Sequence, residues 1–248
     1  MTTLWRCETK NHEDGRKRWY YTAMPPIAPR SRIKPLATVV TGSQILAQEL
    51  ACSLDSSQPV ILVGAKPIAN SSIWCLPPVW TTPEVWELIS HQYTIHTIYH
   101  LAPWDMVDIN DPAIVFERIL SESSMLMAMV KSLATGGLLM ITPDTNRCSL
   151  VRNKAFAEAM GQLERQIVYV AQTELWPYAL LRWPFCGEEP DTMSPNSWDV
   201  IRACKEVGQC LNQAINQGMM SPCSLASGGP AMTGAVEIFV PGVSQETR

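Results

Sequence analysis

The sequence is poor in charge and has no long apolar run. Only 17% of its 248 residues are charged, against about a quarter in a typical soluble domain, and no stretch approaches the ~18 consecutive apolar residues of a membrane span. Lys and Arg total 19 against 23 Asp and Glu, a net charge of −4, so the basic field that nucleic-acid binding needs is missing. The N-terminal residues 1–21 lack the apolar segment of a secretory signal. We therefore expect a cytoplasmic protein whose partner is a small molecule or another protein.

The cysteines lack the spacings that zinc sites require. No CxxC and no Cys/His pair at zinc spacing occurs, so we expect no metal site. Most cysteines fall in apolar stretches, which favours buried, reduced thiols. The eight are Cys7, Cys52, Cys75, Cys148, Cys186, Cys204, Cys210 and Cys223. The nine Trp are an unusual number, and they indicate either loop packing or an aromatic-lined cleft.

Composition changes at about residue 35. Residues 1–35 are polar, basic and rich in proline, and we interpret them as an extended leader with one short strand at residues 19–21. From residue 36 apolar strand patterns alternate with helical ones, so residues 36–248 are expected to form a single domain. Expected strands cover residues 36–40, 59–64, 96–101, 138–142, 178–183 and 235–240. Expected helices cover residues 43–54, 83–91, 112–135, 153–169 and 198–218.

This alternation predicts an α/β fold, a Rossmann-like three-layer sandwich with a mostly parallel sheet. The helix after residue 111 has the clearest start, with Asp111 as its N-cap and Pro112 at its first position. The same helix is expected to stop at Gly136 and Gly137.

The turn after the first strand is a candidate cofactor site, formed by Thr41, Gly42 and Ser43. A strand, a Thr-Gly turn and a helix is where a dinucleotide-binding domain holds a pyrophosphate. That geometry normally uses three glycines, whereas Ile45 and the residues after it carry side chains. Dinucleotide binding and a purely structural turn both stay open, and a free helix N-terminus still favours an anion.

The strand at residues 96–101 carries the candidate catalytic group. His100 lies at the carboxyl end of this strand, where open α/β sheets bind ligands, and Asp105 follows in the next loop. We expect either an acid–base pair of His100 with Asp105 or a histidine that only forms a hydrogen bond. Tyr99, Trp104 and Met140 are expected to line a substrate pocket beside them.

Three segments resemble the short-chain dehydrogenase/reductase family. Residues 39–42, 97–102 and 138–142 match the family's cofactor turn, fourth strand and catalytic-serine strand. The resemblance departs at the catalytic pair: Lys154 matches the lysine of Tyr-x-x-x-Lys, but Leu150 stands where the tyrosine would. A protein without that tyrosine lacks the group that protonates the carbonyl oxygen during hydride transfer.

A narrower resemblance covers nearly all of the chain. Residues 156–165, 174–183 and 236–241, with the strand at residues 19–21, look like the non-catalytic structural subdomain of polyketide synthase ketoreductase regions. This implies a pseudo-ketoreductase of polyketide-type secondary metabolism that binds no cofactor and acts as a synthase partner or as an isomerase or cyclase. The alternatives are an NADPH-dependent ketoreductase and a class I methyltransferase, the latter from Gly136 and Gly137 before a strand.

Overall fold

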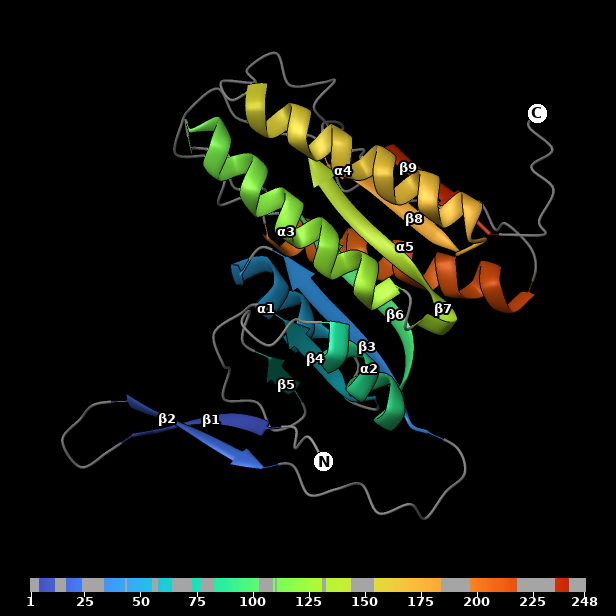
Figure 1. The fold of residues 1–248 in the computed structure, drawn as a ribbon. Coiled ribbons are helices and arrows are strands. Elements are labelled where there is room, and N and C mark those ends of the chain that lie inside the picture. The colour runs from blue at the N-terminus through green and yellow to red at the C-terminus, as the bar shows by residue number, and fades with distance from the viewer. Residues whose placement is uncertain are drawn as a thin grey trace.

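The structure, a computed structural model, describes residues 5–11, 17–23, 34–42, 44–54, 58–63, 73–76, 83–102, 109, 111–130, 133–143, 154–183, 197–217 and 235–240. After two initial strands, strands and helices alternate along these segments (Figure 1). The strands are β1 (Trp5–Asn11), β2 (Lys17–Ala23), β3 (Leu36–Gly42), β4 (Val60–Val63), β5 (Ile73–Leu76), β6 (Thr94–Leu101), β7 (Leu133–Pro143), β8 (Tyr178–Trp183) and β9 (Ala235–Phe239). The helices are α1 (Gln44–Ser53), α2 (Pro83–Gln92), α3 (Pro112–Val130), α4 (Lys154–Thr173) and α5 (Ser197–Gln217).

Seven of the described strands form one sheet in the order β5-β4-β3-β6-β7-β8-β9. Neighbouring strands are parallel except β8 and β9, which are antiparallel. The strand order reverses between β3 and β6, so the carboxyl ends of these two strands form the topological switch point of a doubly wound sheet. The predicted Rossmann-like α/β fold with a mostly parallel sheet is confirmed.

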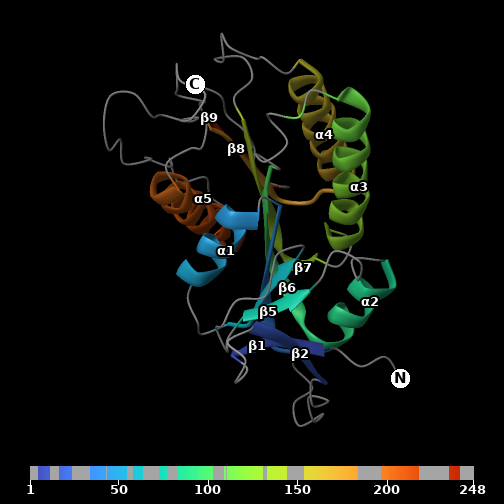
Figure 2. The same ribbon diagram turned by 90° about the vertical axis from the view of Figure 1, so that its left-hand side faces the viewer.

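Helices cover both faces of this sheet. Helices α1 and α5 pack on one side, the α1–α5 face, and α2, α3 and α4 on the other, the α2–α4 face (Figure 2). Side chains alternate along each strand, so Val39 and Ile98 join the core under α2, α3 and α4. Val40 and Leu139 join the core under α1 and α5. Burial on both faces explains why these strands are almost continuously apolar.

Helix α3 starts where the sequence predicts and ends earlier. The Ala113 backbone N–H donates to Oδ1 of Asp111 over 2.9 Å, which confirms the N-cap, and Pro112 is the first helical residue. The helix ends at Val130, however, and Gly136 and Gly137 lie inside β7 rather than in a turn before it. The methyltransferase-like arrangement is therefore not formed. A Cβ at Gly137 would lie 2.7 Å from the Leu211 side chain, so this glycine lets α5 pack closely on β7.

Several other features depart from the expectations. Strand β2 includes the expected strand at residues 19–21, but it pairs with β1 in an antiparallel hairpin that the sequence did not predict. The hairpin lies beside β5, which was also missed because its four residues are followed by two prolines (Figure 1). Cys75 and Cys204 are buried and reduced as expected, but Cys210 is disulfide-bonded, which corrects the expectation of reduced cysteines at that position. None of the described helices is long and apolar enough to cross a membrane.

Candidate functional site

The switch point brings together part of the candidate site. In the register of β3 with β6, Thr41 lies beside His100 and Gly42 beside Leu101. Adjacent strands of a sheet are about 4.8 Å apart, so the predicted cofactor turn and the predicted catalytic histidine are neighbours. Ser43, Trp104 and Asp105, which the sequence also indicates, lie outside the described residues.

Gly42 lies directly against the backbone of the neighbouring strand β6. Its φ is +107°, and a Cβ built on it would lie 1.6 Å from the carbonyl oxygen of Leu101. Any side chain here would therefore collide with the backbone of β6. The missing Cβ makes room for the neighbouring strand, whereas the glycines of a dinucleotide turn make room for a pyrophosphate and for a closely packed helix.

The start of α1 also differs from a dinucleotide cradle. A single residue separates the end of β3 at Gly42 from the start of α1 at Gln44. Further along the helix, Leu46 and Ala47 have exposed fractions of 4% and 0% and belong to the core. The described residues of this turn therefore do not fit NADP in the manner of a glycine-rich turn.

His100 faces a carboxylate that the sequence analysis missed. His100 is fully buried, and its Nε2 lies 3.9 Å from Oε2 of Glu122, a residue on the inner side of α3 that is only 5% exposed. The other oxygen of Glu122, Oε1, accepts a hydrogen bond from Nε of Arg118 over 2.9 Å, and Arg118 is 42% exposed. Burial lowers the pKa of His100 to about 4, so the imidazole is neutral at pH 7.

The predicted pocket residues lie on both faces of the sheet. Met140 is the register partner of His100 and belongs to the core of the α2–α4 face. Tyr99 points to the α1–α5 face, where a Cβ on Gly208 of α5 would lie 2.3 Å from its hydroxyl. Burial, with a smaller contribution from Cys204, raises the pKa of Tyr99 to about 12. The structure thus places Met140 beside His100 and separates both from the Tyr99 side chain.

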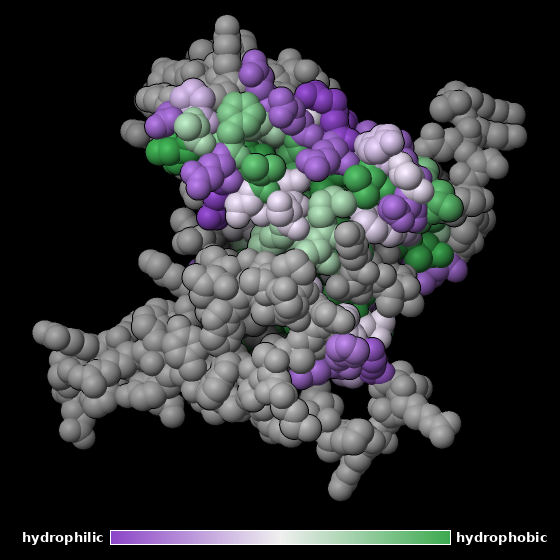
Figure 3. Space-filling view, in the orientation of Figure 1, coloured by the Kyte–Doolittle hydropathy of each residue, from purple (hydrophilic) through white to green (hydrophobic). Residues whose placement is uncertain are grey.

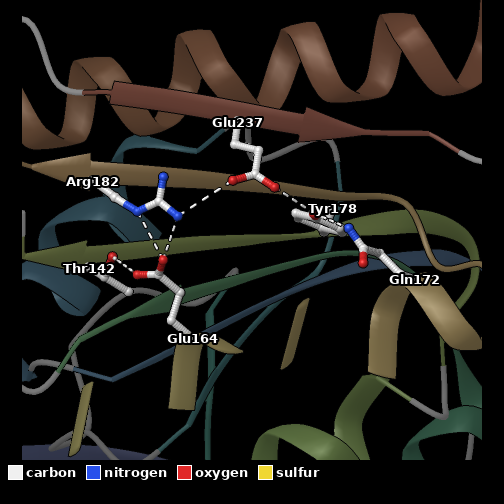
Figure 4. Close-up of polar contacts among 6 residues, drawn as sticks. All are labelled: Thr142, Glu164, Gln172, Tyr178, Arg182 and Glu237. Carbon is white, nitrogen blue, oxygen red and sulfur yellow. Dashed lines mark hydrogen bonds and ion pairs between the residues drawn. The ribbon is translucent and has the colours of Figure 1, made fainter. Parts of the chain in front are cut away.

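A second polar cluster lies on the α2–α4 face, toward the edge of the sheet that β8 and β9 form (Figure 4). Arg182 of β8 donates through Nε to Oε1 of Glu164 on α4 over 2.9 Å, and its Nη2 contacts the same oxygen. Arg182 Nη2 also lies 3.4 Å from Oε2 of Glu237 on β9. The hydroxyl of Thr142, at the end of β7, donates to Oε2 of Glu164 over 3.2 Å. One guanidinium therefore links a helix and two strands.

Tyr178 completes this cluster. Its hydroxyl donates to Oε1 of Glu237 over 2.7 Å and accepts from Nε2 of Gln172 over 3.2 Å. Burial and the Glu237 carboxylate raise the pKa of Tyr178 to about 12. Burial opposes the charge on Arg182, but Glu164 and Glu237 outweigh it and raise the pKa of the guanidinium. The tyrosine and the arginine thus keep their protons at neutral pH.

The missed residues carry a recognisable signal. Glu122 falls on the inward stripe of α3, between Ile119 and Leu126, where an amphipathic helix normally carries an apolar residue. Arg182 and Glu237 each interrupt a short apolar strand. A charged side chain among apolar neighbours is most favourable with a partner, and the structure shows a partner for each of the three.

Comparison with known proteins supports the fold. No family model matches the chain, and no curated protein matches it. A solved structure of the Bacillus cereus enoyl-acyl carrier protein reductase with NADP+ and indole naphthyridinone matches with a TM-score of 0.51 and 15% identity, covering 76% of this chain and 93% of that chain. A short chain dehydrogenase from Burkholderia cenocepacia with NADP matches with a TM-score of 0.51 and 12% identity, covering 76% of this chain and 86% of that chain.

A third match is a multidomain structure with adenylation, ketoreductase and pseudo Asub regions from a keto acid-selecting NRPS module. It covers 84% of this chain and 16% of that chain, with a TM-score of 0.46 and 12% identity. The likeness in fold rests on the first two structures. The chain has the Rossmann-like fold of the short-chain dehydrogenases and reductases.

Proposed function

We propose that the chain is a reductase-like protein that does not transfer hydride. In this proposal it acts in polyketide-type secondary metabolism, as a synthase partner or as a cofactor-independent isomerase or cyclase. The observation that carries the proposal is the turn after β3. Gly42 packs on the Leu101 backbone, and α1 begins only two positions later, so the described turn has no further glycine at which a pyrophosphate could approach the backbone.

The end of β7 gives independent support. The resemblance to short-chain dehydrogenases implies that a catalytic hydroxyl would stand near Thr142. The Thr142 side chain is buried and donates to Glu164, which is itself paired with Arg182. In the sequence Leu150 occupies the place of the family's tyrosine. A hydroxyl bound to a carboxylate and a missing proton donor both argue against carbonyl reduction.

The pathway part of the proposal rests on the sequence resemblance to the structural subdomain of ketoreductase regions. That subdomain shares the fold of the catalytic one but does not perform its reaction. A polyketide-type small molecule and a synthase protein are the partners that this resemblance implies, and fold alone specifies neither of them.

An NADPH-dependent reductase is the second candidate. It is favoured by the two solved structures that share the fold and contain NADP. For this candidate to hold, NADPH would have to bind without the glycine-rich turn and a different group would have to donate the proton.

Titration with NADPH separates the two candidates. The purified chain is followed by intrinsic Trp fluorescence and by thermal unfolding, with inorganic pyrophosphate at equal ionic strength as the control for non-specific anion binding. We expect NADPH to cause no more change than pyrophosphate does. Saturable NADPH binding at micromolar concentration would contradict the proposal and favour the reductase. S-adenosylmethionine in a parallel titration tests the methyltransferase alternative.

A further inference from the structure

Two buried side chains at the switch point have polar atoms without partners. Among the described residues, neither ring nitrogen of His100 has a hydrogen-bond partner, and neither does the hydroxyl of Thr41. Both residues are almost completely buried, at 0% and 1% exposure. Buried polar groups are nearly always hydrogen-bonded, and each exception needs a physical explanation.

These atoms lie on the same face of the sheet. Val39 belongs to the core of the α2–α4 face and Val40 to the opposite core, so alternation returns Thr41 to the α2–α4 face. His100 points to that face as well, because its Nε2 lies 3.9 Å from Oε2 of Glu122 on α3. Thr41 and His100 are also register partners on adjacent strands. Two unpartnered polar groups are therefore neighbours at the position where doubly wound sheets bind ligands.

The donor and acceptor chemistry of this group is specific. A neutral imidazole has one N–H donor and one bare nitrogen that accepts. When Nε2 carries the proton, it points at the acceptor Oε2 of Glu122, and Nδ1 of His100 is left as an acceptor. The Thr41 hydroxyl then supplies a donor. A single O–H group that donates to Nδ1 and accepts from Thr41 would satisfy both residues.

We propose that Thr41, His100 and Glu122 form a binding site for one uncharged hydroxyl group, the alcohol or enol oxygen of a small-molecule ligand. The charges favour a neutral group, because the buried Glu122 carboxylate would repel an anion in a medium of low dielectric constant. Arg118, the cation beside Glu122, bonds the carboxylate through Oε1, the oxygen that does not face His100. The site therefore differs from a phosphate-binding helix terminus, and the proposal holds whether or not the chain also binds NADPH.

Nitrogen NMR of labelled histidine tests this site directly. The chain has four His, so the signals of His100 are assigned by comparison with the His100→Asn variant. We expect the Nε2–H tautomer at pH 7. Added 2-propanol should shift the Nδ1 signal saturably, whereas acetone, which only accepts hydrogen bonds, and inorganic pyrophosphate should not. Thr41→Val should weaken the 2-propanol effect about fivefold, the usual loss for one hydrogen bond.

Thr97→Val is the matched control, since Thr97 is an equally buried threonine of β6 whose hydroxyl has partners in His96 and Asn212. This variant should leave the response to 2-propanol unchanged. A His100 ring protonated at Nδ1 would overturn the proposed site, because Nδ1 could then not accept a hydrogen bond from the ligand. The tautomer is measured on the unsubstituted protein, so this result does not depend on the folding of any variant. If Nδ1 is hydrogen-bonded but its signal does not respond to 2-propanol, then only an ordered water occupies the site. That result would overturn the proposal that the site binds a ligand hydroxyl. Each outcome is independent of the NADPH titration.

Discussion

At the scale of single residues, the most constrained side chain is His100. It is fully buried on β6, its ring faces the Glu122 carboxylate, and Glu122 is in turn bound by Arg118. Burial lowers its pKa from 6.5 to about 4, which means that the folded protein resists protonation of this ring more than the unfolded chain does. The stability of the protein therefore depends on pH through this group.

We predict that the free energy of unfolding falls as the pH decreases from about 6.5 to about 4. In this window the unfolded chain binds a proton at His100 and the folded protein does not, so acid favours unfolding. The pKa difference corresponds to about 3 kcal/mol when fully developed below pH 4. Urea unfolding at several pH values measures how the free energy of unfolding depends on pH. His100→Asn should flatten the curve, whereas His91→Asn, at an exposed position of α2, should not. If the free energy of unfolding depended on pH in the same way in the unsubstituted protein and in both variants, His100 would not be the group responsible.

The candidate site shows how far sequence reasoning reaches at this scale. His100 and Thr41 could be found because they end apolar strands, and strand ends at a switch point are where ligands bind. The acidic partner was sought in the next loop, at Asp105. Asp105 lies outside the described residues, and among those described the structure presents Glu122 from α3, about one helical turn past Ile119. The residue of the following helix that faces His100 is set by how this helix packs on the sheet, and a local sequence pattern does not specify that packing.

At the scale of elements, the edge strand β9 is joined to its neighbours by a cluster of charged and polar side chains as well as by backbone pairing. It is the only antiparallel strand of the described seven-stranded sheet. Its Glu237 accepts from Tyr178 and pairs with Arg182, which also binds Glu164 of α4 (Figure 4). An inward-pointing charged residue on an edge strand also discourages pairing with other chains. This cluster thus adds side-chain contacts to the backbone pairing of β9 with β8.

We predict that Arg182→Met destabilises the protein by about 1–3 kcal/mol, because two carboxylates lose their shared partner in a half-buried site. Arg202→Met is the matched control. Arg202 pairs with Glu206 on α5 at 62% exposure, and an exposed pair of this kind contributes only about 0.3–0.5 kcal/mol. Urea unfolding compares the two variants, and hydrogen exchange at β9 should accelerate only in Arg182→Met. Equal losses of stability would show that the cluster does not fix the strand.

Element boundaries were predictable where local chemistry decides them. Asp111 and Pro112 define the start of α3, and the apolar runs of β3, β4, β6 and β8 stand out clearly. The end of α3 was misplaced because Leu133 continues the apolar spacing of the helix, although the chain already enters β7 there. Strand β5 is short and was missed. The antiparallel direction of β9 depends on the path of the preceding chain, which no residue pattern records.

At the scale of the whole molecule, the described strands differ in how many neighbouring elements cover them. The central strands β3, β6 and β7 have neighbours on both edges and helices over both faces (Figures 1 and 2). The β1–β2 hairpin is a separate two-stranded sheet that lies beside β5.

The outer surface of α3 and α4 mixes hydrophilic with hydrophobic residues (Figure 3). It includes Leu120 and Tyr169, which are 67% and 70% exposed.

We predict that amide hydrogen exchange is slowest in β3, β6 and β7 and fastest in the β1–β2 hairpin. Amides of a central strand exchange only when the helices on both faces separate from the sheet, whereas a two-stranded ribbon opens locally at little cost in free energy. Exchange followed by mass spectrometry measures these rates segment by segment. Protection of β1 and β2 equal to that of β6 would mean that these two strands are integrated into the main core.

The packing of Gly42 against Leu101 also has an evolutionary consequence. Since no side chain fits between these two strand ends, selection for folding alone would preserve this glycine in every descendant of the fold. A Thr-Gly pair at this turn would then persist in lineages that had lost every trace of nucleotide binding. When relatives of this chain are aligned, an invariant glycine at this position should count as evidence of descent and folding, and evidence of cofactor use should be sought at the residues that follow it.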